Sequence, residues 1–246
     1  MRILAIDAGN SRIKWGLHDG EAWAVRGQVP TAEARRLVRE WGPITRADVV
    51  IAANVAGPRV VREIGAAARR HGRRARFIRS LARQCGVSSS YDDPAQLGAD
   101  RWAALIGAWR LYRGPCVVVS AGTTMTVDAL TGDGVFLGGM IVPGTDLMRE
   151  ALARNTAALK PRAGRFAFFP ACTADAIASG ALNALAGAVE RMHRYLREAG
   201  QVAPLTVLSG GGAARLAPQL NARAEVVDNL VLEGLVHIAL DRASVP

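Results

Sequence analysis

The chain has 246 residues and a mass of 26.0 kDa, which is enough for one large domain or two small ones. Half of the residues are hydrophobic and only 21% are charged, so the composition is that of a globular protein and excludes general disorder. The formal charge of +10 rests on 29 arginines and two lysines, and seven of the arginines lie at positions 69–83 without an acidic residue among them. Such a run is typical either of a protein with a phosphate-rich partner or of a solvated surface in a chain with a bias towards arginine.

The first half of the chain begins with two short strands joined by a tight turn. Apolar residues at 2–6, turn formers at 7–11 and alternating apolar residues at 13–17 predict this strand, turn and strand. A third strand at 22–29 ends at Pro30, and Thr31 is expected to cap the helix that follows. Further along, the pattern predicts a buried strand at 49–53, a helix at 58–71, a short strand at 77–78 and a helix at 100–111.

The second half repeats the opening pattern. An apolar run at 116–119, a turn at 120–124 and strands at 126–130 and 135–142 follow, with the two turns 113 positions apart. Helical segments at 173–199, a strand at 205–209, a glycine turn at 210–212 and a last helix at 229–241 complete the chain. We therefore expect an α/β protein with two duplicated halves, 1–114 and 115–246, divided near Gly114 and Pro115.

The cysteines and the apolar segments indicate the cellular compartment in which we expect the protein. Three scattered cysteines, Cys85, Cys116 and Cys172, are too few for a disulfide framework or a zinc site and favour a reducing compartment. Asp7 interrupts the first apolar run too early for a signal peptide. The uncharged segment 176–189 is shorter than the roughly 20 residues of a membrane span. We expect a cytoplasmic protein without a membrane segment.

The turn at 7–11 has the composition of a phosphate-binding turn. Gly9 permits a tight turn, the backbone amides and the side chains of Asn10 and Ser11 supply donors, and Asp7 can hold a metal ion or a metal-bound water. An ordinary hairpin turn has a similar composition. The second such turn, at 120–124, favours function, because a nucleotide can then be held in a cleft between the two halves.

The glycine turn at 210–212 follows an apolar strand and precedes a helix. Glycines in this place let the backbone approach a flat ligand such as adenine, or they only form the turn. The spacing does not match a dinucleotide-binding motif, and neither Lys14 nor Lys160 follows a glycine, which excludes a P-loop. ATP must therefore be bound by another kind of motif.

The three glycine turns resemble the phosphate 1, phosphate 2 and adenosine motifs of the actin, hexokinase and Hsp70 superfamily of ATP-using enzymes. Within this superfamily, residues 91–102 with their Gly98-Ala99-Asp100-Arg101 core are similar to the signature of type III pantothenate kinases. The resemblance covers nearly the whole chain in order, including Gly138-Gly139-Met140-Ile141, Pro143-Gly144 and Thr173. It implies two ribonuclease-H-like (actin-like ATPase) halves, with mixed five-stranded sheets flanked by helices.

The resemblance also implies an activity, a set of ligands and their contacts. It implies ATP-dependent phosphorylation of the primary hydroxyl of pantothenate to 4'-phosphopantothenate, the first step of coenzyme A biosynthesis. The implied cofactors are Mg²⁺ and a monovalent cation, K⁺ or NH4⁺. The implied assembly is a homodimer whose substrate pocket lies at the subunit interface. Asp100 is implied as the base that accepts the hydroxyl proton, and Asp7 as a residue of the Mg²⁺ and phosphate site. The implied ATP contacts are Asp7, Ala8, Gly9, Asn10, Ser11, Arg12, Ile13, Lys14, Gly122, Thr123, Thr124, Gly210, Gly211 and Gly212. The implied pantothenate contacts are Tyr91, Gly98, Ala99, Asp100, Arg101 and Thr173.

Two positions depart from the pattern of the family. Ser120 stands where many members carry an aspartate that helps to hold the monovalent cation, and a hydroxyl offers an oxygen ligand without the charge. The departure weakens the expectation of potassium activation, and Asp128 on the returning strand is a candidate source of the missing charge. Asp93 stands where an asparagine is common, which adds negative charge beside an acidic substrate.

Two other functions are compatible with parts of the sequence. Another small-alcohol or sugar kinase of the same superfamily would share the fold and the phosphate turns. A nucleic-acid-binding regulator on a kinase fold would use the arginines at 69–83. That run lacks the interleaved aromatic residues of single-strand binders and matches no helix-turn-helix pattern, so we do not expect nucleic acid as a partner.

Overall fold

The computed structural model describes residues 1–41, 47–157, 159 and 162–241. The chain forms two compact units, Met1–Arg113 with Asn229–Pro246, and Gly114–Asp228. The last helix of the chain therefore groups with the first unit, and not with the 115–246 half in which the sequence placed it. Each unit is described separately below.

The sheet of the first unit has five strands in the order β3-β2-β1-β4-β5. β1 is antiparallel to β2 and parallel to β4, while β2 pairs antiparallel with β3 and β4 pairs parallel with β5. The near-continuous apolar sequence of the central strands fits their burial on both faces. The strands are β1 (Ile3–Ala8), β2 (Arg12–His18), β3 (Trp23–Pro30), β4 (Val49–Asn54) and β5 (Ala75–Phe77).

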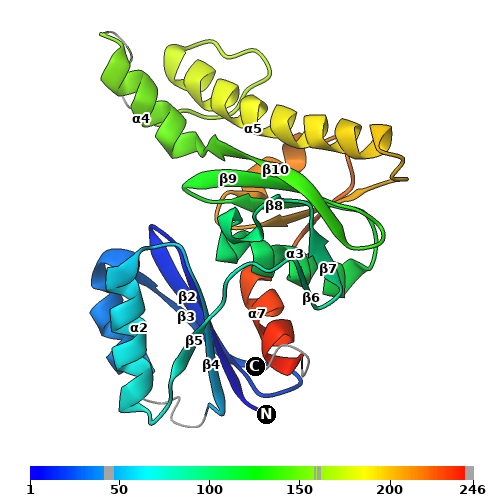
Figure 1. The fold of residues 1–246 in the computed structure, drawn as a ribbon. Coiled ribbons are helices and arrows are strands. Elements are labelled where there is room, and N and C mark those ends of the chain that lie inside the picture. The colour runs from blue at the N-terminus through cyan, green and yellow to red at the C-terminus, as the bar shows by residue number, and fades with distance from the viewer. Residues whose placement is uncertain (42–46, 158, 160–161, 242–246) are drawn as a thin grey trace. The chain divides into compact units, whose positions relative to one another are not determined.

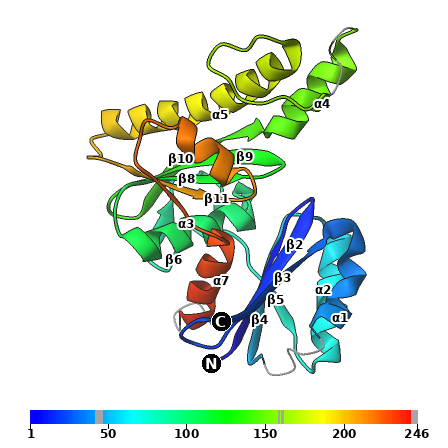
Figure 2. The same cartoon turned by 180° about the vertical axis from the view of Figure 1, so that it is seen from behind.

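Helices cover both faces of this sheet. Figures 1 and 2 show α1 and α2 on one face and α7 on the other. α2 begins at Pro58, a residue well suited to the first helical position, and it buries Val60, Ile64, Ala67 and Ala68 along one side. The remaining elements of this unit are η1 (Thr31–Arg36), α1 (Leu37–Glu40), α2 (Pro58–Arg70), β6 (Arg83–Gln84), β7 (Val87–Ser89), η2 (Pro94–Gln96), α3 (Ala99–Tyr112) and α7 (Leu230–Leu240).

Glycines let α3 and α7 approach each other closely. A Cβ on Gly107 of α3 would lie 2.6 Å from the carbonyl oxygen of Leu230, and a Cβ on Gly234 of α7 would overlap the carbonyl of Ala103. Residues 101–109 of α3 are all buried, since this helix is enclosed on every side along that stretch. This close backbone packing explains why α7 belongs to the first unit although it lies at the far end of the sequence.

The five strands of the second unit repeat the arrangement of the first. They follow the order β12-β11-β8-β9-β10, so that β8, β9, β10, β11 and β12 correspond to β1, β2, β3, β4 and β5. β8 is antiparallel to β9 and parallel to β11, as β1 is to β2 and β4. The prediction of duplicated α/β halves is confirmed. The strands are β8 (Cys116–Ala121), β9 (Thr124–Leu130), β10 (Val135–Pro143), β11 (Leu205–Ser209) and β12 (Ala224–Val226).

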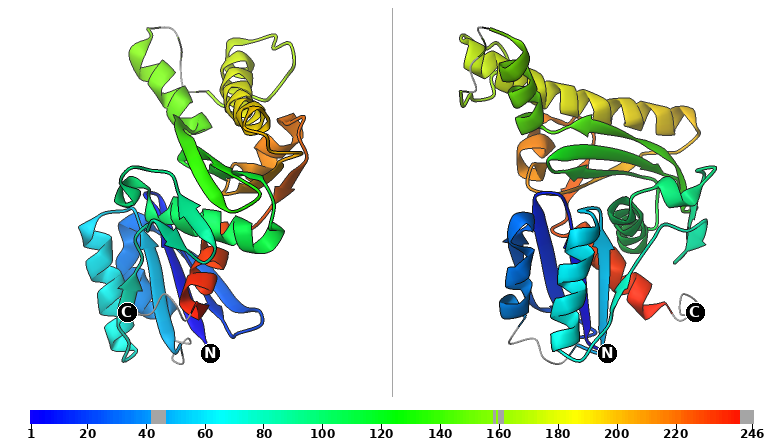
Figure 3. Two further views of the ribbon diagram at one scale, coloured as in Figure 1. Left: turned by 45° about the vertical axis from the view of Figure 1, so that its right-hand side comes forward. Right: turned by 60° about the vertical axis from the view of Figure 1, so that its left-hand side comes forward.

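A long helix crosses the sheet of the second unit, as Figure 3 shows. This helix, α5 (Thr173–Glu198), packs Leu182, Leu185, Val189 and Met192 onto the sheet. The sequence analysis did not predict α4 (Thr145–Asn155), which has no buried residue and so lacks a strong apolar stripe. α6 (Ala213–Leu216) and η3 (Ala217–Gln219) follow β11. No helix within the described residues is long and apolar enough to cross a membrane.

Part of the arginine run at 69–83 stabilises the first unit. The Arg73 Nε donates to the carbonyl of Ala47 at 2.6 Å, and the Arg76 guanidinium donates to the carbonyl of Ile238 at 3.2 Å. Both bonds satisfy backbone acceptors that flank the sheet. The side chains of these two residues therefore have a structural role in this unit.

Candidate active site

The phosphate 1 turn joins β1 to β2 at the end of the first sheet. Its closing hydrogen bond runs from the Gly9 amide to the carbonyl of Arg12 at 3.1 Å. Asn10, Ser11 and Arg12 are exposed, whereas Ala8 and Ile13 are fully buried and contribute to the core. The accessible part of this turn therefore consists of Asn10, Ser11 and Arg12, whereas Ala8 and Ile13 are not accessible to a ligand in this structure. Asp7 and Lys14 are direct cross-strand partners, which places their side chains on the same face of the sheet.

Thr31 has a different role from the one expected. No side-chain cap is formed at the start of η1, where Pro30 is the N-cap residue. The Thr31 hydroxyl instead donates to the carbonyl of Gly9 at 2.7 Å, and the Thr31 amide donates to the carbonyl of Ser11 at 3.0 Å. The expected helix cap is wrong, because the hydroxyl is used by the phosphate 1 turn.

Asp100 lies in the first turn of α3, where the helix dipole favours a carboxylate. One carboxylate oxygen accepts from the Arg101 amide at 2.9 Å. Gly98 immediately precedes the helix, and a Cβ at that position would lie 2.6 Å from the same oxygen. Gly98 therefore leaves the room that the Asp100 carboxylate occupies. Arg101 is only 6% exposed and also makes interactions of its own.

The charges of Asp100 and Lys14 act on the carboxylate of Asp7. Burial, and then the charge of the Asp100 carboxylate, raise the pKa of Asp7 from 3.8 to about 7, and the Lys14 ammonium partly offsets this rise. Two carboxylates that repel each other in a partly buried place are suited to a divalent cation, whose charge would relieve the repulsion. This pair is the feature of the structure that fits Mg²⁺.

Tyr91 and Asp93 lie in the loop that leads to α3. The Tyr91 amide donates to the hydroxyl of Ser89 at 3.2 Å, which shapes the start of the loop. The Asp93 carboxylate accepts from the amide of Ala95 at 3.0 Å and caps η2. An asparagine could cap in the same way through its side-chain oxygen, so the aspartate is accommodated here by a local structural role.

Three glycine segments meet at one end of the second sheet. The phosphate 2 turn closes from the Gly122 amide to the carbonyl of Thr124 at 3.0 Å. The Gly144 amide donates to the carbonyl of Thr123 at 2.9 Å, and the Gly212 amide donates to the carbonyl of Ala121 at 2.9 Å. The structure thus joins the phosphate 2 turn to the adenosine motif at 210–212 and to Gly144. The turn residues Gly122, Thr123 and Thr124 are exposed.

Ser120 lies on β8 beside Thr126 of β9 and Ser209 of β11. Asp128 pairs with Val118, two residues before Ser120, so it points to the same face of the sheet as Ser120. Asp128 is 1% exposed and takes part in interactions, and the hydroxyl of Thr126 is buried without a hydrogen-bond partner. Hydroxyl oxygens and one buried carboxylate therefore share this face of the second unit.

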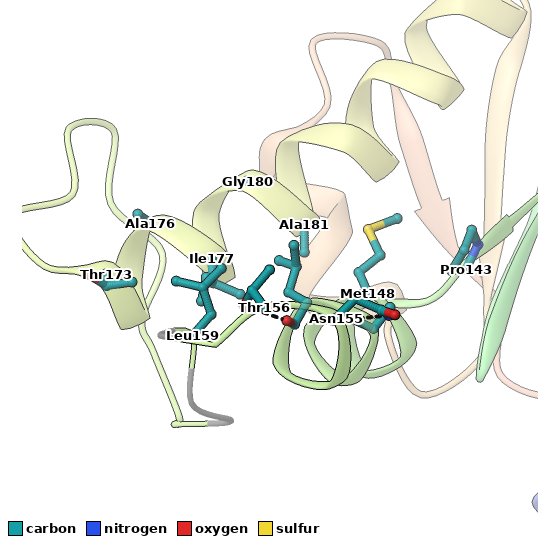
Figure 4. Close-up of a pocket in the computed structure, with 12 residues that line it drawn as sticks. Pro143, Met148, Asn155, Thr156, Leu159, Thr173, Ala176, Ile177, Gly180 and Ala181 are labelled. Atoms are coloured by element: carbon teal, nitrogen blue, oxygen red, sulfur yellow. Dashed lines mark hydrogen bonds between the residues drawn. The ribbon is translucent and has the colours of Figure 1, made fainter.

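Thr173 is the first residue of α5 and lines an apolar cavity of about 730 Å³. In Figure 4 the cavity lies between α4 and α5, with Met148 and Ile177 among the side chains at its wall. It extends to Pro143, the residue before Gly144. Thr173 and Pro143 therefore line the same cavity. The sequence analysis did not predict this cavity, because α4, which it missed, supplies four of the twelve lining residues.

Within the described part of the chain, metal-ligating side chains do not form a cluster of three. Among residues 1–41, 47–157, 159 and 162–241, no three histidine, cysteine, aspartate or glutamate side chains form a cluster that could hold a metal ion. His237 is held by its surroundings as a neutral group: burial, and then Arg110, lower its pKa to about 4.

The two matching strand orders, each with a glycine turn between its first two strands, define the duplicated α/β fold of actin-like proteins. Two solved structures share this fold with TM-scores of 0.62 at 20% identity. One, described as a candidate Baf family transcriptional activator from Campylobacter jejuni, is aligned over 98% of this chain and 100% of its own. The other, described as a candidate 2-dehydro-3-deoxygalactonokinase from Sinorhizobium meliloti, is aligned over 97% and 98%. At this identity they show the fold alone.

Sequence comparisons identify the family within this fold. The profile of type III pantothenate kinases matches residues 3–195. A type III pantothenate kinase from Nitrosospira multiformis is 46% identical over 237 residues, covering 96% of this chain and 90% of that protein. One from Aromatoleum aromaticum is 49% identical over 250 residues, covering 98% and 99%. The chain belongs to the type III pantothenate kinase family.

Proposed function

We propose that this chain transfers the γ-phosphoryl group of ATP to the primary hydroxyl of pantothenate, which yields 4'-phosphopantothenate and ADP as the first step of coenzyme A biosynthesis. The family match supports this reaction. The single observation that carries the proposal is the electrostatic effect of Asp100, at the start of α3, on the pKa of Asp7 beside the phosphate 1 turn. This interaction supports a site in which the proposed base for the acceptor alcohol lies close to the proposed turn for the donor phosphates.

In the proposed reaction, Asp100 accepts the proton of the pantothenate hydroxyl as the alcohol oxygen bonds to the γ-phosphorus and the bond to the ADP oxygen breaks. The hydrogen bond from the Arg101 amide orients the carboxylate and leaves its second oxygen available for the proton. Tyr91, Gly98, Ala99, Arg101 and Thr173 form the proposed contacts with pantothenate. Arg101 supplies positive charge for the carboxylate or for the transferred phosphoryl group.

For ATP, we assign the β- and γ-phosphates to the turn between β1 and β2 with Lys14, and to the second turn at Gly122, Thr123 and Thr124. The segment 210–212 is the proposed place of the adenosine. Mg²⁺, held through Asp7, would neutralise charge on the phosphates during transfer. The exposed residues of the two turns and the glycine segments that meet beside the second turn support this assignment.

The monovalent cation is the least supported ligand. Ser120 gives an oxygen but no charge, while Asp128 places a buried carboxylate on the same face of the second sheet. We expect K⁺ or NH4⁺ to stimulate this enzyme less than it would stimulate a relative with an aspartate at position 120. The test measures the activity of the wild-type protein and of the Ser120→Asp variant in K⁺, NH4⁺ and Na⁺ buffers.

We also propose that the enzyme is a homodimer that works in the cytoplasm, with the second subunit closing the pantothenate pocket. The exposed Phe168 and Phe169, at 85% and 95%, precede α5 and its Thr173, and such apolar groups are commonly covered by a partner. Light scattering on the wild-type protein and on a Phe168→Ser, Phe169→Ser variant tests the assembly. A monomer that is fully active would overturn it.

The central test measures ADP release by the purified chain with and without pantothenate, together with the mass of the product. We expect release that depends on pantothenate and a product heavier by one phosphoryl group. If ADP release does not depend on pantothenate but is stimulated by a sugar or another alcohol, the chain is a kinase of the same fold with a different acceptor.

A further inference from the structure

Thr31 fastens the phosphate 1 turn at two points. Its hydroxyl binds the carbonyl of Gly9 and its amide binds the carbonyl of Ser11, at 2.7 and 3.0 Å. Thr31 itself is 6% exposed, so water competes little for these bonds. The two acceptors are the residues on either side of Asn10, the exposed tip of the turn.

These bonds set the direction of the amide at the tip. The peptide unit between Gly9 and Asn10 is trans, so its carbonyl and its N–H point in opposite directions. Since the Gly9 carbonyl points to the Thr31 hydroxyl, the Asn10 N–H points away from Thr31. The hydroxyl therefore fixes the aim of a backbone donor in the turn to which we assign the nucleotide phosphates.

Arg59 holds Thr31 in turn. Its guanidinium donates to the Thr31 carbonyl at 3.0 Å from the second residue of α2. The backbone carbonyl, the backbone amide and the side chain of Thr31 are thus all engaged, by Arg59, Ser11 and Gly9. A chain of hydrogen bonds runs from the start of α2 to the phosphate 1 turn.

We propose that Thr31 is a positioning residue for the nucleotide phosphates and that Arg59 supports it. The inference rests on the proposed function in one respect, the assignment of the phosphates to the turn between β1 and β2. Thr31 acts through the direction of the Asn10 amide and touches no reacting atom. Its removal therefore affects the use of ATP and leaves the use of pantothenate unchanged.

The experiment compares Thr31→Val, which keeps the shape and loses the hydroxyl, with Thr31→Ser, which keeps the hydroxyl. We expect Thr31→Val to raise the KM for ATP by about two- to tenfold, the effect of one hydrogen bond, with the KM for pantothenate unchanged. Thr31→Ser should restore the wild-type value. Arg59→Gln should raise the KM for ATP in the same direction, and Arg62→Gln, at an exposed position of the same helix, is the matched control.

A second readout separates this inference from the proposed reaction. Calorimetry with a non-hydrolysable ATP analogue measures nucleotide binding without any transfer to pantothenate, and the Kd should follow the same order among the variants. If pantothenate proves not to be the acceptor, the binding series still tests Thr31.

Several results would overturn the inference. One is a folded Thr31→Val variant with the wild-type KM and Kd for the nucleotide. Another is a Thr31→Val variant that loses only thermal stability. A third is an equal rise in the KM for ATP and in the KM for pantothenate. If Thr31→Val does not fold, an Arg59→Gln variant that binds the analogue as the wild type does is the decisive contrary result. A wild-type protein that binds no nucleotide would overturn both the inference and the proposed function.

Discussion

Asp100 raises the pKa of Asp7, since the two carboxylates act on each other within the first unit. Burial is the larger cause, and together they bring the pKa of Asp7 to about 7. The residue that faces the proposed Mg²⁺ site is therefore kept in an environment that disfavours its own charge. Such an arrangement favours function at the expense of the stability of the free protein.

The first prediction concerns this cost. An unfolded aspartate has a pKa of 3.8, so between about pH 4 and 7 the folded protein holds a proton at Asp7 that the unfolded chain has lost. The contribution of Asp7 to stability therefore falls as the pH rises through this window. Asp7→Asn should raise the Tm of the nucleotide-free protein more at about pH 8 than at about pH 5, by roughly 2–4 °C for each kcal/mol recovered.

The control for this experiment is Asp92→Asn, which changes an exposed aspartate in the loop before α3. Its effect on the Tm should be the same at both values of the pH. An Asp7→Asn variant whose Tm difference from the wild type does not change with pH would show that the carboxylate is ionised without penalty.

The second prediction concerns the proposed base. Asp100→Asn keeps the size of the side chain and an oxygen that can accept from the Arg101 amide, but it cannot take up a proton. We expect kcat to fall by about 10²- to 10⁴-fold, the range of general base catalysis. Full activity in this variant would remove Asp100 from the role of base.

The third prediction uses the close approach of Gly98 to Asp100. An alanine at position 98 places its Cβ 2.6 Å from the carboxylate oxygen, which must move, although the backbone φ of −56° suits alanine. We expect kcat to fall by roughly tenfold or more, while stability changes by less than about 1 kcal/mol because a side chain can rotate away.

Gly187 on α5 serves as the comparison for Gly98. A Cβ at Gly187 meets nothing within 4 Å, so Gly187→Ala should stabilise the helix by up to about 1 kcal/mol and leave kcat unchanged. Chemical unfolding and steady-state rates are measured for both variants. A Gly98→Ala enzyme with the wild-type kcat would contradict the proposed place of the carboxylate.

Local sequence patterns were enough to predict most strands, since β1, β4, β8 and β11 are short apolar runs bounded by turn formers. The repeat of the turn at 113 positions was enough to predict the duplicated topology. Contacts distant in sequence were harder to predict. The packing of Gly234 on Ala103 brings the last helix to the first unit, and no local pattern signals it.

The same limit applies to the candidate site. The hydroxyl of Thr31 bonds to a turn 22 positions earlier, and from sequence it looked like a helix cap. The glycine at position 144 matched a family motif, but only the structure shows its amide on the carbonyl of Thr123. The roles of individual site residues remain predictions that the variants described here are designed to test.

The fourth prediction concerns acid conditions. Burial, and then Arg110, lower the pKa of His237 from 6.5 to about 4, so between these values the unfolded chain takes up a proton that the folded protein excludes. This contribution to stability is present above about pH 6.5 and is lost as the pH falls towards 4. His237→Gln should lose less stability than the wild type between about pH 7.5 and 5 in urea unfolding, opposite in sign to the effect of Asp7. An equal loss in both proteins would contradict it.

The fifth prediction contrasts two neighbouring glycines of the adenosine motif. Gly210 has a φ of +96°, and a Cβ there would lie 2.5 Å from the backbone oxygen of Ala121. Gly210→Ala should therefore destabilise the protein by about 2 kcal/mol or more, from left-handed strain and from a backbone contact that cannot yield. It should also weaken nucleotide binding, since the Gly212 amide bonds to that same oxygen.

The neighbouring Gly211 is the control for this prediction. A Cβ on Gly211 meets nothing within 4 Å, so Gly211→Ala should change stability by no more than about 0.5 kcal/mol. Urea unfolding and calorimetry with an ATP analogue compare the two variants. Equal effects at both positions would mean that the motif does not depend on the contact between Gly210 and Ala121.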